Sequence, residues 1–339
     1  MMTSFYLTVL ALYLPFAGLW IFLRRRESPS QKGEEFIEIK PLVINFGLKN
    51  NLKAAFCATF NFMKTFSVKP GLYYTGEKDD NSPIFVTCNY FLTIFLLARR
   101  IGKRNVRLLV IDTDGINVWC SAGKGKFSAK AILEAAKRSQ LLNKAEKVQI
   151  ILPKFCLSGV KLDDLKKGGI KPVIGPLYAK DVPDYLDRGK LENRFEEIVS
   201  FGFQSRLFTA FTTAVQFFYY SLGLYVLGLG YIPFNVVSAV TALAFLYPIL
   251  FPWLPGKLFT TKGLWQALFV VIGVFLLNLT VKTFLLWALF ILATQLFIAL
   301  SYTGNSAVSN YTGVRKETAR FLPTIGLLYI LIIPTFFLL

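Results

Sequence analysis

The sequence predicts a protein of two parts: a Rossmann-like α/β domain on a parallel sheet, and an α-helical transmembrane bundle. Between residues 84 and 190, short β-branched, apolar runs alternate with segments of helical periodicity, a pattern typical of a doubly wound parallel sheet. The 339-residue chain is 54% hydrophobic, with a mean hydropathy of +0.50, which is more apolar than ordinary soluble proteins. The excess lies in residues 7–23 and from about Leu207 onward.

Residues 1–26 are predicted to form an N-terminal transmembrane anchor. The apolar stretch of residues 7–23 is followed directly by Arg24-Arg25-Arg26. A cleaved signal peptide is the alternative, but its basic residues would precede the apolar run, and no small-residue cleavage site is evident. The arginines should hold the next part of the chain on the cytoplasmic side of the membrane.

Residues 27–67 are expected to form a linker and a lead-in helix, and residues 68–200 the α/β domain. The linker is rich in Ser, Pro, Gly and charge, and helical periodicity covers residues 50–66. Ser128 and Asp181 are candidate N-caps of domain helices. The predicted strands are residues 84–87, 106–111, 148–152 and 172–174, and the predicted helices are residues 90–101, 128–139 and 162–167, with another after Asp181.

Residues 205–339 are predicted to form a transmembrane domain of five helices, each near the ~20 residues that cross a bilayer. The spans are residues 207–227, 232–253, 264–281, 284–302 and 321–339. If the α/β domain is cytoplasmic, the loops on its side carry Lys257, Lys262, Arg315, Lys316 and Arg320, and the other side carries only Lys282. This asymmetry agrees with the N-terminal arginines. We therefore expect a multi-pass protein of the cell (inner) membrane with its α/β domain in the cytoplasm.

The formal net charge of +18 raises the question of nucleic-acid binding. The basic residues are scattered through predicted helices, and no helix-turn-helix, RNP or zinc-finger pattern accompanies them. A basic surface beside an anionic membrane leaflet explains the charge more simply. We expect no nucleic-acid partner.

The chain has four cysteines and no histidine, which excludes Ser-His-Asp and Cys-His nucleophiles and H-E-x-x-H zinc sites. The cysteines are widely spaced and form no C-x-x-C, so neither a four-cysteine zinc site nor an iron–sulfur cluster is expected within this chain. Cys57 and Cys156 are expected to be buried, small hydrophobic residues. Cys88 follows a short strand and is ambiguous.

Cys120 has a different setting, because it follows soon after the strand of residues 106–111 and the turn Asp112-Thr113-Asp114-Gly115. Ligands of open α/β sheets bind at the carboxyl ends of the strands. The segments expected along that edge are Thr87 to Tyr90, Asp112 to Gly115, Leu152-Pro153 and Gly175-Pro176. The run Gly123-Lys124-Gly125-Lys126 lacks the spacing of a phosphate-binding loop, and its glycines are expected to end a short helix.

The octapeptide Asn117-Val118-Trp119-Cys120-Ser121-Ala122-Gly123-Lys124 resembles the cap-helix motif N-[VI]-W-C-[AS]-[AG]-G-K of the HgcA family, the membrane-anchored corrinoid proteins of microbial mercury methylation. The resemblance extends from about Val68 to the C-terminus. It departs from the family in the added N-terminal span and at Asn305, where the family more often has a small residue or cysteine. The α/β domain also resembles the large subunit of the corrinoid iron–sulfur protein. Further similar segments are residues 68–73, 87–90, 112–116, 151–153, 175–178, 251–257, 303–306 and 313–317.

The resemblance implies a corrinoid-dependent methyltransferase that binds cobalamin or a related corrinoid, with Cys120 as the catalytic residue and lower axial cobalt ligand. It leaves two interpretations open for Trp119 (packing on the corrin, or on the domain), for Asn117 (a helix cap, or a hydrogen bond to the domain) and for Lys124 (contact with corrinoid amides, or with the helix C-terminus). Cofactor contacts are expected from Thr87, Thr113, Gly115, Asn117, Val118, Trp119, Cys120, Ala122, Gly123, Lys124, Leu152, Pro153, Gly175 and Pro176.

The implied reaction transfers a methyl group to Hg(II) and forms methylmercury. A thiolate ligand donates electrons strongly and favours departure of the methyl group as a carbanion equivalent, which the soft Hg(II) ion accepts. Lys124 and the metal itself are expected to lower the pKa of the Cys120 thiol. Implied partners are a ferredoxin-like electron donor (HgcB type) and a methyl donor of the methyltetrahydrofolate pathway. A corrinoid methyl carrier for one-carbon metabolism or another acceptor, and a non-catalytic corrinoid-binding membrane protein, are the alternatives.

Overall fold

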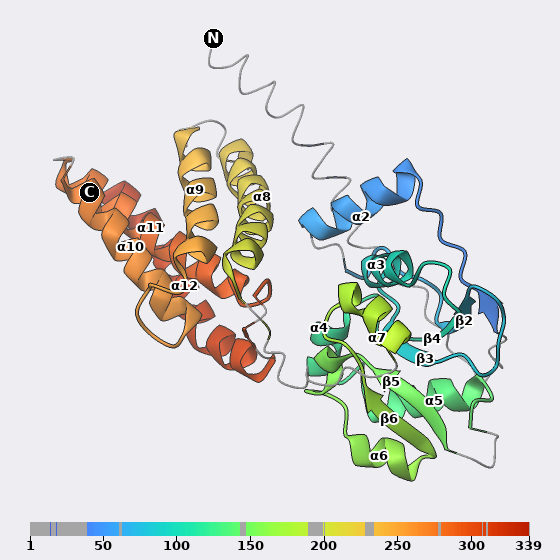
Figure 1. The fold of residues 1–339 in the computed structure, drawn as a ribbon. Helices are drawn as coiled ribbons and strands as arrows, with labels where there is room; N and C mark the ends of the chain where they lie inside the picture. The colour runs from blue at the N-terminus through green and yellow to red at the C-terminus, as the bar shows by residue number, and fades with distance from the viewer. Residues whose placement is uncertain are drawn as a thin grey trace. The chain divides into compact units, whose positions relative to one another are not determined.

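The computed structural model describes most of the chain from Ile39 onward. The described residues are 14, 18, 39–60, 63–142, 147–188, 199, 201–227, 234–276, 279–306, 308–309 and 311–338. Apart from residues 14 and 18, the predicted N-terminal anchor lies outside them, as do residues 27–38 of the predicted linker and lead-in segment. Of the described residues, 39–188 belong to an α/β unit, and 199–338 belong, with residues 14 and 18, to a helical unit. Figure 1 colours both units along the sequence.

The α/β unit is built on a sheet with strand order β1-β2-β4-β3-β5-β6. Its strands are β1 (Lys40–Pro41), β2 (Gly71–Thr75), β3 (Ile84–Cys88), β4 (Val106–Ile111), β5 (Val148–Leu152) and β6 (Ile170–Ile174). The four neighbours β4, β3, β5 and β6 are parallel. This confirms the predicted parallel arrangement for these strands and places their carboxyl ends along one edge, called the carboxyl edge below.

The predicted parallel sheet omits β2, which was not among the predicted strands. This strand runs antiparallel to β4, with Gly71 opposite Val110 and Thr75 opposite Val106, and the short β1 pairs with it in parallel. The two tyrosines of β2 are only half-buried. β2 therefore lacks the continuous apolar run by which buried parallel strands are recognisable in a sequence.

The helices of the α/β unit lie close to the predicted ranges. Ser128 is confirmed as the N-cap of α5, since its side chain accepts a hydrogen bond from the Ala131 N–H. The lead-in helix is shorter than predicted and ends at Phe60 instead of residue 66. The helices are α2 (Leu48–Phe60), α3 (Phe91–Ile101), α4 (Val118–Gly123), α5 (Ala129–Arg138), α6 (Leu162–Lys167) and α7 (Val182–Arg188), with 3-10 turns at Lys154–Cys156 and Ala179–Asp181.

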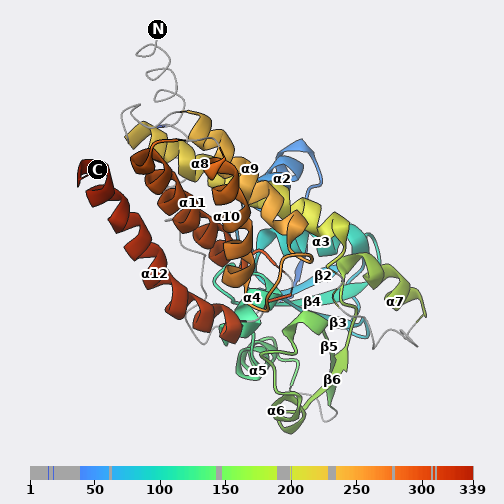
Figure 2. The same ribbon diagram turned by 90° about the vertical axis from the view of Figure 1, so that its left-hand side faces the viewer.

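Both faces of the sheet are covered, as expected of a doubly wound fold (Figure 2). Successive side chains of a strand point to opposite faces. Leu109 and Ile111 of β4 join a buried cluster with residues of α4, α5 and α6. Leu108 and Val110 join a second cluster with residues of α3 and α7. β4 is consequently buried along its whole length, which explains why five of its six residues are apolar; the sixth, Arg107, donates hydrogen bonds to the Ser82 carbonyl.

Within its described residues from 199 onward, the helical unit contains five helices, each of which overlaps one predicted span; the bounds of the third and the fifth differ from the prediction by up to ten residues. The helices are α8 (Phe203–Leu227), α9 (Asn235–Leu250), α10 (Phe259–Phe275), α11 (Val281–Tyr302) and α12 (Tyr311–Leu338). Within the described residues, two segments, Phe203–Leu227 and Thr283–Tyr302, are long and apolar enough to cross a membrane, while α9 and α10 are apolar but shorter. That these five helices form a transmembrane domain stays a prediction.

Within the helical unit, charged side chains form hydrogen bonds with backbone groups at the ends of α9 and α10. Leu258, at the N-cap position of α10, has no side chain that could cap the helix. The buried carboxylate of Glu317, on α12, instead accepts hydrogen bonds from the Thr260 N–H (2.6 Å) and hydroxyl (2.7 Å). At the other end of the neighbouring α9, Arg206 donates to the Ile249 carbonyl at 2.6 Å. Each charge has the sign that its helix end favours.

Replacing Glu317 with alanine is expected to lower the free energy of unfolding of the helical unit by about 3 kcal/mol. The change removes two hydrogen bonds to a charged group and leaves the first turn of α10 without a buried acceptor. Thr260→Val, which removes only the hydroxyl, should cost about half as much. Thermal unfolding of the detergent-solubilised full chain measures the effect. The adjacent exposed Lys316→Ala is the control, and an equal effect of both substitutions would contradict the cap assignment.

Candidate functional site

Asn89 joins the ends of two strands at the carboxyl edge. Its side-chain oxygen accepts hydrogen bonds from the Thr113 N–H (3.1 Å) and the Gly115 N–H (2.8 Å). Its amide nitrogen donates to a carboxylate oxygen of Asp112 at 3.2 Å. The Thr113 hydroxyl lies 2.9 Å from the same Asn89 oxygen. The loop after β4 is thereby held against the end of β3.

This loop needs backbone conformations that favour glycine. Asp114 and Gly115 have φ angles of 56° and 63°, in the left-handed region. A Cβ on Gly115 would lie 2.9 Å from the Lys64 Cα, and the Lys64 N–H donates to the Gly115 carbonyl at 2.9 Å. Asp114 also forms an ion pair with Lys126. Gly115 therefore serves a close backbone approach, and its side-chain position offers nothing to a ligand.

The octapeptide forms the short cap helix α4. The Asn117 side chain accepts a hydrogen bond from the Cys120 N–H at 2.8 Å, which confirms the helix-cap interpretation of Asn117. The Ser121 hydroxyl donates to the Asn117 carbonyl at 2.6 Å. The helix ends at Gly123, and Gly125 follows with a φ of 73°. The glycines end a helix here, as predicted.

One face of the cap helix is buried and the other is accessible. Val118 and Ala122 belong to the main core cluster, and Ser121 is fully buried. A Cβ on Gly159 would lie 2.3 Å from the Ala122 carbonyl oxygen, so α4 rests directly on the backbone after β5. The half-buried Trp119 and Cys120 lie between the buried positions. The helix thus fixes their backbone while their side chains keep access to solvent.

Cys120 is the one cysteine of the four that is not buried. Cys57 and Cys156 are buried as predicted, and burial raises their pKa values to about 11 and about 12. Cys88, which the sequence left ambiguous, is also buried, and desolvation raises its pKa. A metal or an electrophile can therefore reach only one of the four thiols in this conformation.

We predicted that Lys124 and a bound metal lower the pKa of the Cys120 thiol. The protein residues alone raise it, so for them the prediction is wrong. Partial burial raises the pKa of this thiol, and this effect outweighs the opposing influences of Lys124 and of the Asn117 side chain. The expected direction for Lys124 is right, but its ammonium group is exposed and screened. Without a metal, the surroundings of Cys120 favour the neutral thiol.

The remaining residues that were predicted to contact the cofactor are mostly buried at the carboxyl edge. Thr87, Leu152, Gly175 and Pro176 are buried, and Pro153 is half-buried. The Gly175 N–H donates to the Leu152 carbonyl at 2.9 Å, and a Cβ on Gly175 would lie 2.5 Å from an Ile151 methyl group. These residues bring the ends of β5 and β6 together. Thr113 and Gly115, in the loop after β4, are buried as well. The predicted residues that are not buried in this conformation are Asn117, Trp119, Cys120, Gly123, Lys124 and Pro153.

Sequence reasoning missed two residues that organise the site. Asn89 was placed at the carboxyl edge but not among the site residues, and Gly159 was not considered. An amide directly after a buried strand is a readable signal, because it meets unpaired N–H groups of the neighbouring loop. The contact between Gly159 and Ala122 joins residues distant in sequence, and no local pattern indicates it.

The site lies within a region that matches known proteins. Residues 53–172 match the family model CdhD, CO dehydrogenase/acetyl-CoA synthase delta subunit. The chain is 34% identical over 119 residues to the corrinoid/iron-sulfur protein large subunit of Moorella thermoacetica, covering 34% of this chain and 26% of that protein. It is 32% identical over 123 residues to the acetyl-CoA decarbonylase/synthase complex subunit gamma of Methanopyrus kandleri, covering 36% and 26% of the two chains.

The α/β unit is related to these proteins. This confirms the predicted likeness to the large subunit of a corrinoid iron–sulfur protein. The chain spans about a quarter of the length of the curated relatives that it matches (26% and 28% of the first two). The finer resemblance to the HgcA family stays a prediction.

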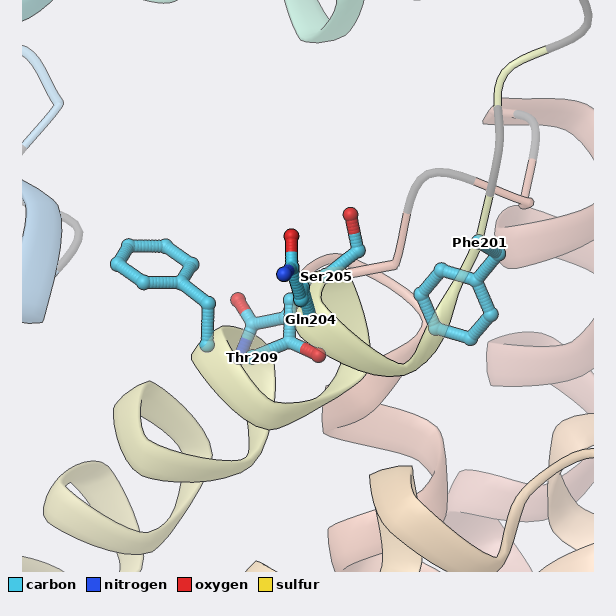
Figure 3. Close-up of a pocket in the computed structure, with 6 residues that line it drawn as sticks. Phe201, Gln204, Ser205 and Thr209 are labelled. Carbon is cyan, nitrogen blue, oxygen red and sulfur yellow. The ribbon is translucent and has the colours of Figure 1, made fainter.

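The helical unit carries a hollow of its own at the start of α8 (Figure 3). Its volume is about 350 Å³. Asn305, the residue at which the sequence departs from the HgcA pattern, lies in the wall of the hollow. It donates hydrogen bonds to Thr213 (3.3 Å) and Gln216 (3.4 Å) of α8. These bonds fix the loop after α11 against α8. The hollow is lined by Phe201, Gln204, Ser205, Phe208, Thr209 and Asn305.

Replacing Asn89 with alanine is expected to lower the free energy of unfolding of the α/β unit by about 3 kcal/mol. The buried N–H groups of Thr113 and Gly115 would lose their acceptor. Chemical denaturation followed through Trp119 fluorescence reports on this unit when the other four tryptophans (20, 253, 265 and 287) are replaced by phenylalanine. Asn81→Ala, an exposed change before β3, should leave the midpoint unchanged. A shift below about 0.5 kcal/mol for Asn89→Ala would show that the loop is held by other contacts.

Proposed function

We propose that the α/β unit binds a corrinoid at its carboxyl edge, with Cys120 as the lower axial ligand of cobalt. The observation that carries this proposal is the placement of Cys120. It is the accessible thiol of the chain, on a capped helix at the edge where α/β sheets bind ligands. The match of residues 53–172 to relatives that include a corrinoid protein supports the same cofactor.

The donor set at this edge fits a cobalt ligand. The chain has no histidine, so it offers no imidazole ligand of its own, and its other three cysteine sulfurs are buried. The Asn117 oxygen holds the Cys120 N–H at 2.8 Å, and Gly159 supports the helix from below at Ala122. These contacts position the sulfur before any cofactor arrives, which lowers the ordering cost of ligation.

The proposed activity is methyl transfer to Hg(II), which forms methylmercury. When bound, a methylcorrinoid would supply a methyl group that departs as a carbanion equivalent toward the soft Hg(II) ion. Cys120 would donate electron density from the thiolate, and Lys124 would stabilise its negative charge. Trp119, beside it on α4, would cover the cofactor or pack against the domain.

Turnover would need partners that carry the other half of the chemistry. We propose a ferredoxin-like electron donor of the HgcB type, which would return two electrons after each methyl transfer. A methyl donor of the methyltetrahydrofolate pathway would restore the methyl group. No group of three or more potential metal-ligating Cys, His, Asp or Glu residues occurs in the described part of the chain.

We also propose that this is a multi-pass protein of the cell (inner) membrane. The anchor of residues 1–26 and the five helices of residues 205–339 would cross the bilayer, and residues 68–200 would form the cytoplasmic domain. The distribution of basic residues between predicted loops supports this orientation. The apolar character of α8 and α11 agrees with it.

A second candidate is a corrinoid methyl carrier for one-carbon metabolism or another acceptor. The named relatives favour it, because they include subunits of acetyl-CoA decarbonylase/synthase complexes. The cofactor and the role of Cys120 would be the same, and only the acceptor would differ. A non-catalytic corrinoid-binding membrane protein would share the site and lack turnover.

The Cys120→Ala variant is expected to lose the cobalt–thiolate absorption of the corrinoid-loaded protein, and with it methylmercury formation in cells. The cause is loss of the sulfur donor while the helix, capped by Asn117, persists. Absorption spectra of the purified full chain provide the measurement. Cys57→Ala removes a buried sulfur from α2 and should retain the wild-type spectrum. A thiolate signature that persists in Cys120→Ala would remove the axial-ligand role.

The acceptor is tested separately with the protein loaded with methylcorrinoid. We expect methylmercury to form when Hg(II) is added, together with loss of the methyl group from the cofactor. Transfer to another acceptor without reaction with Hg(II) would favour the methyl-carrier function. Stable methylcorrinoid in the presence of every acceptor tested would favour the non-catalytic function. Quantification of methylated products distinguishes these outcomes.

A further inference from the structure

The α/β unit exposes several aliphatic side chains around its first helix. Val43 is 85% exposed, Leu48 77% and Leu52 60%. Leu96, on the neighbouring α3, is 47% exposed. Leu48 and Leu52 are four residues apart on α2, so they share one helix face. We call these four residues and the basic Lys49 the lead-in patch.

Hydrogen bonds hold the lead-in patch rigidly in place. The Asn50 side chain donates to the Asn45 carbonyl at 2.7 Å, which fixes the turn into α2. Phe46 packs on Phe95 of α3 with ring centroids 5.4 Å apart. Arg99 donates to the Asn51 side chain at 3.1 Å. The exposed leucines are thus presented outward by an ordered surface.

Leu96 belongs to the same surface as the helix α2. It lies three residues before Arg99, one turn away on the same face of α3. Arg99 in turn contacts α2 through Asn51. The aliphatic side chains of two packed helices therefore flank the same contact.

The surroundings of the lead-in patch are basic. Residues 39–60 and 91–104 contain no aspartate or glutamate. Of their basic residues, Arg104 is paired with Asp187, and Lys53 lies 3.9 Å from the centroid of the Phe91 ring. Those with exposed side chains are Lys40, Lys49, Arg99, Arg100, Lys103 and Arg104.

The sequence places this surface within short reach of the proposed anchor. Arg26 ends the anchor, and Ile39 begins the described α/β unit. The twelve residues between them (27–38) extend to at most about 40 Å. Any surface close to Ile39 is therefore kept near the membrane if residues 1–26 span it.

We propose that the lead-in patch docks on the anionic lipid surface of the membrane. Its leucines and valine would lie between the lipid headgroups, and the surrounding lysines and arginines would contact phosphate groups. Aliphatic side chains interleaved with basic ones, on a helix tethered beside a membrane, are the chemistry of interfacial helices. Each basic residue near an anionic bilayer strengthens docking about fivefold. The proposal rests on the proposed membrane anchor, and it is independent of the corrinoid.

The test uses the full chain reconstituted into vesicles, with a spin label at Leu52→Cys. Cys120→Ser serves as the background, because the other three native cysteines are buried. In vesicles of phosphatidylcholine and phosphatidylglycerol, we expect the label to collide several-fold more often with oxygen, which concentrates in the bilayer, than with a water-soluble nickel chelate. Lys171→Cys is the matched control. It is exposed on β6, at the opposite edge of the sheet from β1, and it should favour the chelate.

Charge reversal tests the electrostatic half of the proposal. Lys49→Glu with Arg100→Glu should lower the docked fraction at least fivefold and return the Leu52 label to the aqueous chelate. Pure phosphatidylcholine vesicles should have the same effect. Three results would overturn the proposal: chelate access at Leu52 equal to that at Lys171, shielding from both reagents, or insertion unaffected by charge. Shielding from both would show that protein covers the patch. Since no cofactor is needed, failure here is distinct from failure of the corrinoid function.

Discussion

The side-chain amide of Asn89 is the contact on which the geometry of the carboxyl edge depends. Backbone hydrogen bonds align β3 and β4 as far as Cys88 and Ile111, and beyond those residues the ladder stops. Asn89 continues the pairing with side-chain atoms, accepting from Thr113 and Gly115. The loop it fixes leads directly into α4. The position of Cys120 therefore depends on the side-chain amide of a residue that follows a different strand. A sulfur that binds a ligand requires rigid support of this kind.

The sequence alone was sufficient to predict the elements whose pattern depends on residues close together in the chain. Val106–Ile111 is buried on both faces, so its sequence is apolar except for Arg107, and Ser128 caps α5 in the pattern that Ser favours. The antiparallel β2 escaped prediction because its tyrosines are half-buried and its partner is chosen by tertiary contacts. The support of α4 by Gly159 escaped for the same reason. Local chemistry predicts elements, and the contacts between distant elements decide how they support the site.

For Cys120, a fixed position and a low thiol pKa are conflicting requirements. Positioning needs packing, and packing desolvates the sulfur, which raises its pKa. A reactive thiolate in the absence of metal would need a strong positive neighbour, but Lys124 is exposed and too well screened to supply this. A metal ligand has no such need, because coordination itself displaces the proton. The arrangement thus suits a sulfur that acts when ligated and stays neutral otherwise, in contrast to a free nucleophile.

The α/β unit has acidic residues at its carboxyl edge and none in the segments that carry the lead-in patch. The carboxyl edge contains Asp112, which accepts a hydrogen bond from the Asn89 amide, and Asp114, which forms an ion pair with Lys126. The segments that carry Leu48, Leu52 and Leu96 have no acidic residue. A nucleic-acid site would gather its basic residues into a polar groove or stripe, whereas here exposed aliphatic side chains lie among the basic residues of α2 and α3. This arrangement matches the chemistry of an anionic bilayer better than that of a nucleic acid, because only the bilayer offers anionic groups above an apolar layer.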